Sequence, residues 1–433
     1  MTELLAAAAL GEFARALRTG QREPTAALDS VRERFEAVEP TVQAFVDEPN
    51  WGRLAAELDD LGTRHGSPGG RPPLYGVPVG IKDIFHVDGH PTRAGASVPE
   101  ETIAGPQGSA VDALEAAGAI VLGKTVTAEF AHFEPGPTRN PHAPEHTPGG
   151  SSSGSAAAVA AGLCPLALGT QTIGSVTRPA AFCGIVGVKP SYGRIPTDGV
   201  FPAAPSVDTV GYFTQDLDGA RLAGSVLCEH WRDGTDPEAL ETIGVVDGPY
   251  LDSASDEGRA QFRSHVGELD AAGFDVYRIE LFPDIETVNE RHERLVAAEM
   301  ALSHGELYPE YGDQYAEQTA ALIEEGQSVS VGRLSEDRAG RGELRRAIHD
   351  RMDEHGLDVV VSPAAPGPAP ETLDSTGDPI MNLPWTHAGV PTVTVPASTT
   401  DDGLPLGLQC ATRFGDDERL LRWSQQIRAT LDQ

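Results

Sequence analysis

Hydrophobic positions along the chain follow a helical period at the N-terminus and then form short apolar runs that alternate with helical stretches. Leu28, Val31, Phe35 and Val38 recur at helical spacing after a Pro-Thr start, which predicts an amphipathic helix packed as an outer layer. The strands that the apolar runs predict lie at 76–81, 119–123, 165–170, 242–247, 274–281, 357–362, 392–397 and 406–412. Helices are expected near 109–117 and from Ser155.

The alternation of strands and helices predicts an α/β fold in which helices cover both faces of a sheet. No repeat and no Pro/Gly linker divides the 433 residues, so we expect a single domain over 1–433. The stretch 285–355 has many charges and few helix breakers. It is predicted to form a helical cap over the sheet that contributes to a substrate pocket.

The charge balance limits the classes of partner. With 65 acidic and 32 basic residues the net charge is −33, which disfavours binding to nucleic acid or to an anionic membrane. Lysine occurs only at Lys82, Lys124 and Lys189. This composition is typical either of a salt-rich cytoplasm or of a codon bias, and we favour adaptation to salt.

Cysteine and histidine positions favour a reduced, cytoplasmic and metal-free protein. The four cysteines show no CxxC spacing, so free thiols are expected. The N-terminus has no basic segment, and no run of about 18 apolar residues follows, so neither secretion nor a membrane span is predicted. Two histidine pairs are four residues apart, 86/90 and 142/146, but neither lies on a predicted helix, and we expect no metal.

The Gly/Ser-rich segment 149–184 contains five serines but no histidine or acidic residue that could act as a base. A flexible linker is one interpretation, but an Ala-rich helix and an apolar strand follow directly. A second interpretation is a G-x-S-x-G nucleophile elbow centred on Ser152. Such an elbow needs a preceding strand, but a proline-rich loop precedes Ser152. A third interpretation uses Ser175, Ser151 and Lys82.

In the third interpretation a strand ends in a glycine-containing turn beside Ser175. The turn directs the N–H groups of Thr172, Ile173, Gly174 and Ser175 toward one point, as in an oxyanion hole. Lys82 ends an apolar strand, and burial would lower the pKa of its amine until the neutral form could serve as a base. A salt bridge from Lys82 to Asp83 is the alternative.

Three segments carry a resemblance to a known family: "YGVPVGIKDIFHVDG", "TPGGSSSGSAAAVAAGLCPLALGT" and "GSVTRPAAFCGIVGVKPSYGRIP". In order and spacing they resemble the core motifs of the amidase signature family, over roughly 72–215. The resemblance implies that Lys82 is the catalytic lysine, Ser151 the bridging serine and Ser175 the nucleophile. It also implies one α/β/α domain around a mixed, twisted sheet, and amide hydrolysis without metal or cofactor.

The chain departs from the commonest family pattern around the nucleophile. Gln171 and Thr177 stand where that pattern has aspartate and arginine, so both members of an expected ion pair are missing together. Arg178, with Gln215 downstream, is similar to the malonamidase-like branch, in which the corresponding residues face the substrate. A loop-holding role for Arg178 and a turn-capping role for Gln215 remain open. Ile173 replaces a commoner glycine and leaves the backbone angle φ of the turn in question.

The sequence therefore predicts an amidohydrolase that cleaves a small carboxamide through a Ser-Ser-Lys relay, with a carboxylated, malonamate-like amide as a candidate substrate. One alternative is the glutamine amidase (A-type) subunit of a tRNA-dependent amidotransferase. Another is a non-catalytic binding protein on the same fold. The only expected partner is a small amide, and the oligomeric state stays open, with a homodimer as one option.

Overall fold

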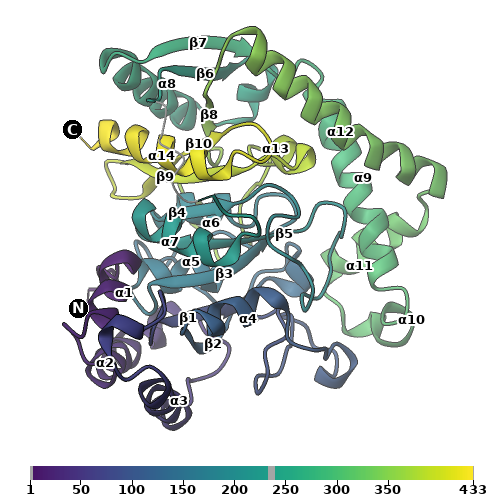
Figure 1. Ribbon diagram of the computed structural model, residues 1–433. Helices are drawn as coiled ribbons and strands as arrows, with labels where there is room; N and C mark the ends of the chain where they lie inside the picture. Colours follow the sequence, from purple (N-terminus) through teal and green to yellow (C-terminus); the bar gives the residue numbers. More distant parts are fainter. Residues whose placement is uncertain (1–2, 233–238, 433) are drawn as a thin grey trace.

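The computed structural model describes residues 3–232 and 239–432, and its centre is one ten-stranded sheet. The strand order is β2-β1-β3-β5-β4-β9-β10-β8-β6-β7, which Figure 1 shows from bottom to top. The strands are β1 (Pro78–Lys82), β2 (Ile120–Thr125), β3 (Leu166–Gln171), β4 (Val186–Lys189), β5 (Thr209–Thr214), β6 (Thr242–Asp247), β7 (Asp275–Glu280), β8 (Val359–Pro363), β9 (Thr392–Thr399) and β10 (Pro405–Ala411). Strands from both halves of the chain share this sheet, so it joins the described residues into one body.

The sheet is mixed, as the resemblance implied. Strands pair in parallel at both ends, where β1 lies between β2 and β3, and β6 lies between β7 and β8. The middle pairs, from β3 through β5, β4, β9 and β10 to β8, are antiparallel. Most of the strands are buried along their full length, which is typical of a sheet with both faces covered.

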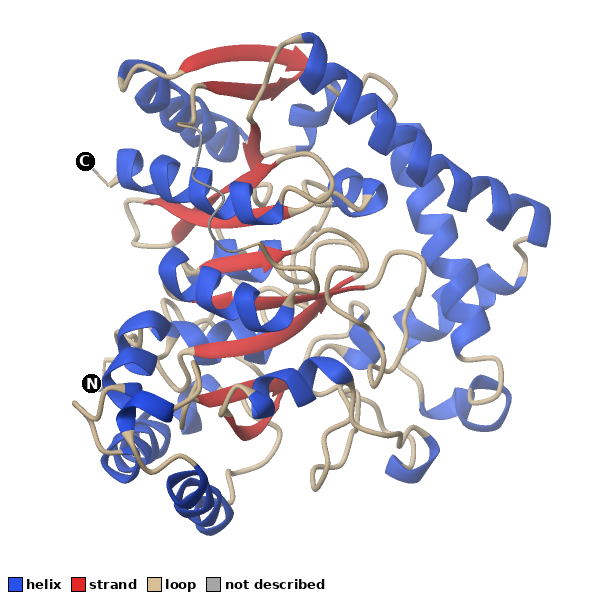
Figure 2. Ribbon diagram, viewed as in Figure 1, coloured by secondary structure: helices blue, strands red, loops and turns tan. Residues whose placement is uncertain are grey.

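Helices cover both faces of the sheet (Figure 2). They are α1 (Leu10–Arg18), α2 (Pro24–Val42), α3 (Trp51–Arg64), α4 (Ser109–Ala116), α5 (Ser153–Ala160), α6 (Thr177–Cys183), α7 (Leu217–Leu227), α8 (Asp256–Ala271), α9 (Ile285–Ser303), α10 (Tyr308–Tyr311), α11 (Glu317–Gln327), α12 (Val331–Glu354), α13 (Leu383–Ala388) and α14 (Asp417–Leu431). Two adjacent residues of β5 point toward helices on opposite faces of the sheet. The Tyr212 hydroxyl donates to the Ala220 carbonyl of α7, 3.0 Å away, whereas Gly211 faces Val176 beside α6.

Most of the elements that the hydrophobic pattern predicts are present. The predicted N-terminal helix is α2, and all four of its periodic residues are buried. The eight predicted strands correspond to β1, β2, β3, β6, β7, β8, β9 and β10 within two residues at each end. Helix α5 begins at Ser153, two residues before the expected start.

Strands β4 and β5 at the middle of the sheet were not predicted. Strand β4 has four residues, and a glycine interrupts the apolar pattern of each strand, at Gly187 and Gly211. Both glycines lie where another side chain or backbone packs on the sheet, because a Cβ on Gly187 would come within 2.5 Å of Ala180 Cβ. Glycine has no side chain, so it allows this close packing. For the same reason it contributes no apolar position to the pattern from which a strand is predicted.

The charged stretch from 285 is helical, and α9, α11 and α12 form a group at one end of the molecule (Figure 1). Helix α9 packs against α11 and α12 and also contacts α13, which lies beside the sheet. His292 of α9 lies 3.0 Å from the Thr172 carbonyl, so one face of α9 lies at the carboxyl end of β3. Over the described ranges, no helix has the length and apolar character required to cross a membrane.

Candidate active site

Lys82 is the last residue of β1, and its side chain is fully buried. Its Nζ atom lies 2.8 Å from Ser151 Oγ and 2.9 Å from Thr170 Oγ1. Burial lowers the pKa of the amine to about 7, and the negative charge of Asp208 only partly opposes this shift. A large part of the Lys82 population is therefore a neutral amine near neutral pH. The alternative salt bridge is absent, because Asp83 pairs with Lys124 at 2.8 Å.

Ser151 lies in the loop that leads into α5, and the contacts of its neighbours fix this loop. Its own carbonyl accepts from Ala128 N at 3.1 Å. The carbonyl of Gly150 accepts from Arg178 Nη2 at 2.7 Å. The Gly150–Ser151 peptide bond is cis. Arg178 follows Ser175 by three residues. The hydrogen bond from Arg178 to Gly150 therefore connects the Ser151 loop to the segment that carries Ser175.

Ser175 lies in the turn between β3 and α6, with 7% of its surface exposed. No hydrogen bond of the described residues joins Ser175 Oγ to Ser151 Oγ, so the expected three-member chain is closed at Lys82–Ser151 and open at its second step. A catalytic contact that is open in a ligand-free site can tighten when substrate binds.

In the turn 172–175 the carbonyl groups of Thr172 and Ile173 are bound, whereas no described residue accepts from its N–H groups. The Thr172 carbonyl lies 3.0 Å from His292 Nε2, and the Ile173 carbonyl accepts from Thr386 Oγ1 at 2.7 Å. Within the described residues, no protein acceptor binds the N–H groups of 172–175. This is the arrangement that an oxyanion hole needs, since free N–H donors can stabilise a developing negative charge.

Residue 174 must be glycine for this turn to pack. A Cβ at Gly174 would come within 2.4 Å of Asn382 Oδ1. Ile173 does not adopt a positive φ, so its bulk costs no backbone strain, and its side chain lines the pocket instead. An isoleucine at position 173 is therefore compatible with the turn.

Gln171 and Thr177 form a neutral pair where the family pattern has two charges. Gln171 Oε1 accepts from Val176 N at 2.8 Å, Thr177 N at 2.9 Å and Thr177 Oγ1 at 3.1 Å. Its Nε2 donates to Thr386 Oγ1 at 2.9 Å. The Gln171 side chain thus binds the start of α6. It also binds the Thr386 hydroxyl, which donates to the Ile173 carbonyl in the turn 172–175.

The sequence did not identify several side chains that support the turn. Asp208 accepts from Thr172 Oγ1 at 2.7 Å. His292 and His387 are fully buried, with 3.2 Å between their Nδ1 atoms. Burial lowers the pKa of His292 to about 3 and that of His387 to about 2, so both rings are neutral. Since His292 Nε2 must donate to the Thr172 carbonyl, its Nδ1 accepts from His387. Only the tertiary fold brings these residues together.

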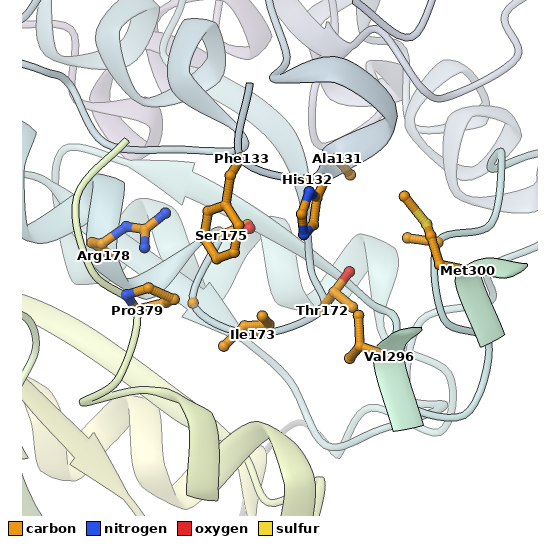
Figure 3. A pocket seen from close by; sticks show the side chains of 12 residues that line it. Ala131, His132, Phe133, Thr172, Ile173, Ser175, Arg178, Val296, Met300 and Pro379 are labelled. Atoms are coloured by element: carbon orange, nitrogen blue, oxygen red, sulfur yellow. The ribbon is translucent and has the colours of Figure 1, made fainter. Parts of the chain in front are cut away.

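A pocket opens directly onto the turn 172–175 (Figure 3). Its lining residues are Ala131, His132, Phe133, Thr172, Ile173, Gly174, Ser175, Arg178, Ala203, Val296, Met300 and Pro379. A larger outer part shares five of these residues and extends to α11 and α13. The helical segment that begins at 285 therefore supplies part of the wall, through Val296 and Met300.

Arg178 lies in the pocket wall, but most of its guanidinium is already bound. Nη1 donates to the Gly377 carbonyl at 2.8 Å, and Nη2 donates to the Gly150 carbonyl and, at 3.0 Å, to Thr376 Oγ1. Only Nε lacks a partner. The burial of this group lowers its pKa to about 9. These contacts favour the loop-holding role that the sequence left open.

The structure places Gln215 outside the lining of the pocket, and its contacts favour a structural role over the predicted one in substrate binding. Its Nε2 donates to the carbonyls of Ala6 and Val159, each at 2.8 Å, and its Oε1 accepts from Ala8 N at 2.6 Å. All of its polar atoms thus fasten the N-terminal segment to α5.

Ser152, the candidate of the elbow hypothesis, bonds to the backbone of Thr170 and does not line the pocket.

The described residues hold no group of His, Cys, Asp and Glu side chains arranged to bind a metal. The reactive set is instead a buried amine, two serine hydroxyls and a turn of free amides on a mixed sheet. Such a set defines the class of hydrolases that attack a carbonyl with serine and use lysine as the base.

The family follows from comparison with known proteins. The sequence model of the amidase family matches residues 26–421, so the chain belongs to this family of amide C–N hydrolases. The A-type subunit of the glutamyl-tRNA(Gln) amidotransferase from Synechococcus sp. (strain WH7803) is 31% identical over 474 residues, covering 98% of this chain and 97% of the relative. The corresponding protein of Koribacter versatilis (strain Ellin345) is 29% identical, with 96% and 97% covered.

Solved structures agree with this assignment. A crystal structure of an amidase has a TM-score of 0.89 with 31% identity and covers 98% of this chain and 99% of its own. The peptide amidase of Stenotrophomonas maltophilia has a TM-score of 0.83 with 25% identity, over 99% and 97% of the two chains. The fold and the amidase class are thus confirmed. These relatives do not single out the malonamidase-like branch that the sequence around Arg178 indicated.

Proposed function

We propose that this protein is an amidohydrolase that converts a small carboxamide to a carboxylate and ammonia through an acyl-enzyme on Ser175. The observation that carries the proposal is the 2.8 Å contact between Lys82 Nζ and Ser151 Oγ, made by a buried lysine whose pKa is lowered to about 7. A buried amine beside a serine hydroxyl can act as a general base without histidine.

In the proposed reaction the neutral Lys82 amine takes the proton of Ser151, and Ser151 takes the proton of Ser175. The Ser175 oxygen attacks the amide carbonyl, and the N–H groups of the 172–175 turn bind the resulting oxyanion. Return of the proton through Ser151 to the amide nitrogen lets the C–N bond break and ammonia leave. Water then attacks the acyl-enzyme through the same relay and releases the carboxylic acid.

Thr170 has a distinct part in this scheme. Its hydroxyl is the second partner of Lys82 Nζ, at 2.9 Å. A neutral amine has two N–H bonds and one lone pair. An N–H bond directed at Thr170 helps to orient the lone pair toward Ser151, so Thr170 is proposed as a positioning residue.

The test compares two serines in the same segment. Ser175→Ala should abolish both the release of ammonia from a panel of amides and the covalent adduct with a fluorophosphonate. Ser152→Ala is the matched control, because Ser152 Oγ bonds only to backbone atoms of Thr170. An inactive Ser152 variant combined with an active Ser175 variant would overturn the proposal.

A second candidate function is the A-type subunit of a tRNA-dependent amidotransferase. The observation that favours it is the match to such subunits along nearly the whole of both chains, at 29–31% identity. A protein of this kind would release ammonia from glutamine and require partner subunits. Coexpression with candidate partners, followed by copurification and an assay of glutamine-dependent ammonia release, distinguishes it from a free-standing hydrolase.

A further inference from the structure

The wall of the pocket beside Ser175 is predominantly apolar. Phe133, Ile173, Val296 and Met300 surround the inner part, as Figure 3 shows. The outer part continues this surface with Leu322, Ile380 and Leu383. In an amide of the form R–CO–NH₂, the group R remains attached to Ser175 after ammonia leaves. A wall of this kind stabilises an apolar R by removing its surface from water.

The cation in this wall is not free to bind a carboxylate bidentately. A guanidinium holds a carboxylate through two parallel N–H donors, and both terminal nitrogens of Arg178 already donate to Gly150, Thr376 and Gly377. The single unpartnered donor is Nε. A carboxylate entering the pocket would therefore lose its hydration and gain at most one hydrogen bond from Arg178 in return.

The entrance of the pocket adds a second barrier to anions. Glu293, Glu325 and Asp378 line the outer part, and none of them takes part in an ion pair of the described residues. Glu325 and Asp378 lie near enough to Glu293 for their charges to raise its pKa, after the larger effect of its burial. The lining of this outer part includes no lysine or arginine. Like-charge repulsion disfavours a substrate that carries a carboxylate.

We infer that the substrate class is an uncharged primary amide whose acyl group is an apolar chain or ring. This group reaches from Ser175 along Ile173 and Val296 toward Leu322 and Leu383, and amides with a carboxylate on the acyl group are poor substrates. The inference rests on the proposed function, whose chemistry it specifies. It also replaces the malonamate-like substrate that the sequence suggested.

Three substrates test the inference. Hexanamide extends acetamide by four carbons, and adipamate is hexanamide with a carboxylate in place of the terminal methyl group. Each methylene that the wall buries should raise kcat/KM about four-fold, so hexanamide should exceed acetamide at least ten-fold. Hexanamide should also exceed adipamate by at least ten-fold, and this second ratio should shrink as KCl is added.

Two pairs of variants locate the effects. Leu322→Gln should lower kcat/KM for hexanamide several-fold more than for acetamide, whereas Leu302→Gln, an exposed position on α9 outside the pocket, should change neither. The double variant Glu293→Gln/Glu325→Gln should raise kcat/KM for adipamate several-fold relative to hexanamide at low salt. Glu343→Gln on the exposed side of α12 is the control for a change of surface charge.

Equal rates on hexanamide and acetamide, or adipamate cleaved as well as hexanamide, would overturn the substrate assignment while the amidase activity stood. Failure of the proposed amidohydrolase function would give a different result. If no amide released ammonia and Ser175 formed no fluorophosphonate adduct, the proposed function would be wrong and the substrate assignment would be overturned with it.

Discussion

Lys82 Nζ and Ser151 Oγ lie 2.8 Å apart although 69 positions separate the two residues in the chain. Parallel pairing of β1 with β3 brings the ends of these strands together and places Thr170 beside the same amine. The burial that lowers the pKa of Lys82 arises because β1 lies between β2 and β3 and is buried along its whole length. The base of the proposed reaction is thus a product of the fold.

The activity should depend on the ionisation of Lys82. Because burial lowers the pKa of this group to about 7, the neutral amine increases as the pH rises through 7. We therefore expect kcat/KM to rise about ten-fold per pH unit below 7 and to level off above it. The measurement is a pH profile with a neutral amide.

The control for this profile is a second buried lysine. Burial lowers the pKa of Lys189 to about 7 as well, but its Nζ contacts only the carbonyls of Pro190 and Val390. Lys189→Gln should keep the ascending limb, whereas Lys82→Ala should lose activity by several orders of magnitude. His132 in the pocket has its pKa lowered to about 4 by burial and cannot produce a limb at 7. A limb that shifted in the Lys189 variant would contradict the assignment.

Arg178→Ala should reduce kcat/KM equally for charged and neutral amides. The guanidinium holds the carbonyl groups of Gly150 and Gly377, so its removal loosens the Ser151 loop whatever the substrate. Loss of charged hydrogen bonds in a buried site costs about 2–5 kcal/mol, and the expected loss is roughly thirty-fold or more. A loss confined to malonamate, with acetamide unaffected, would restore the carboxylate-binding role.

Gln171→Met should lower kcat and also the free energy of unfolding. The variant leaves the buried Val176 and Thr177 donors without an acceptor, which costs about 1–3 kcal/mol. Gln215→Met is the matched control, because it removes a similar set of hydrogen bonds far from the pocket. The control should lower stability and leave kcat unchanged. Equal effects of both variants on kcat would show that Gln171 has no specific part in positioning the turn.

Thermal stability should rise with KCl from dilute to molar concentration. The net charge is −33, and all three lysines are buried, so arginine supplies the strong basic groups among the exposed side chains of the described residues. At 1 M salt the Debye length is about 3 Å, which screens repulsion among surface carboxylates. A melting temperature that stayed constant or fell over this range would favour codon bias as the cause of the composition.

The sequence by itself determined the elements whose signal is local. Periodic apolar residues specified α2, and apolar runs specified eight of the ten strands, most of which need such runs because they are buried on both faces, whereas β7 is largely exposed. Motif order and spacing identified Lys82, Ser151 and Ser175 as candidates. Strands β4 and β5 escaped prediction, since their glycines are required by packing against residues distant in sequence.

Only the tertiary structure decided how the polar groups are used. Arg178 and Gln215 are both hydrogen-bonding residues in or near the motif segments, yet Arg178 lines the pocket with both terminal nitrogens bound to protein acceptors, and Gln215 binds the N-terminal segment. His292 contacts the turn 172–175 from a helix, although 120 positions separate it from Thr172 in the chain. A side chain satisfies its hydrogen bonds with whatever the fold places beside it, and sequence spacing carries no record of that neighbour.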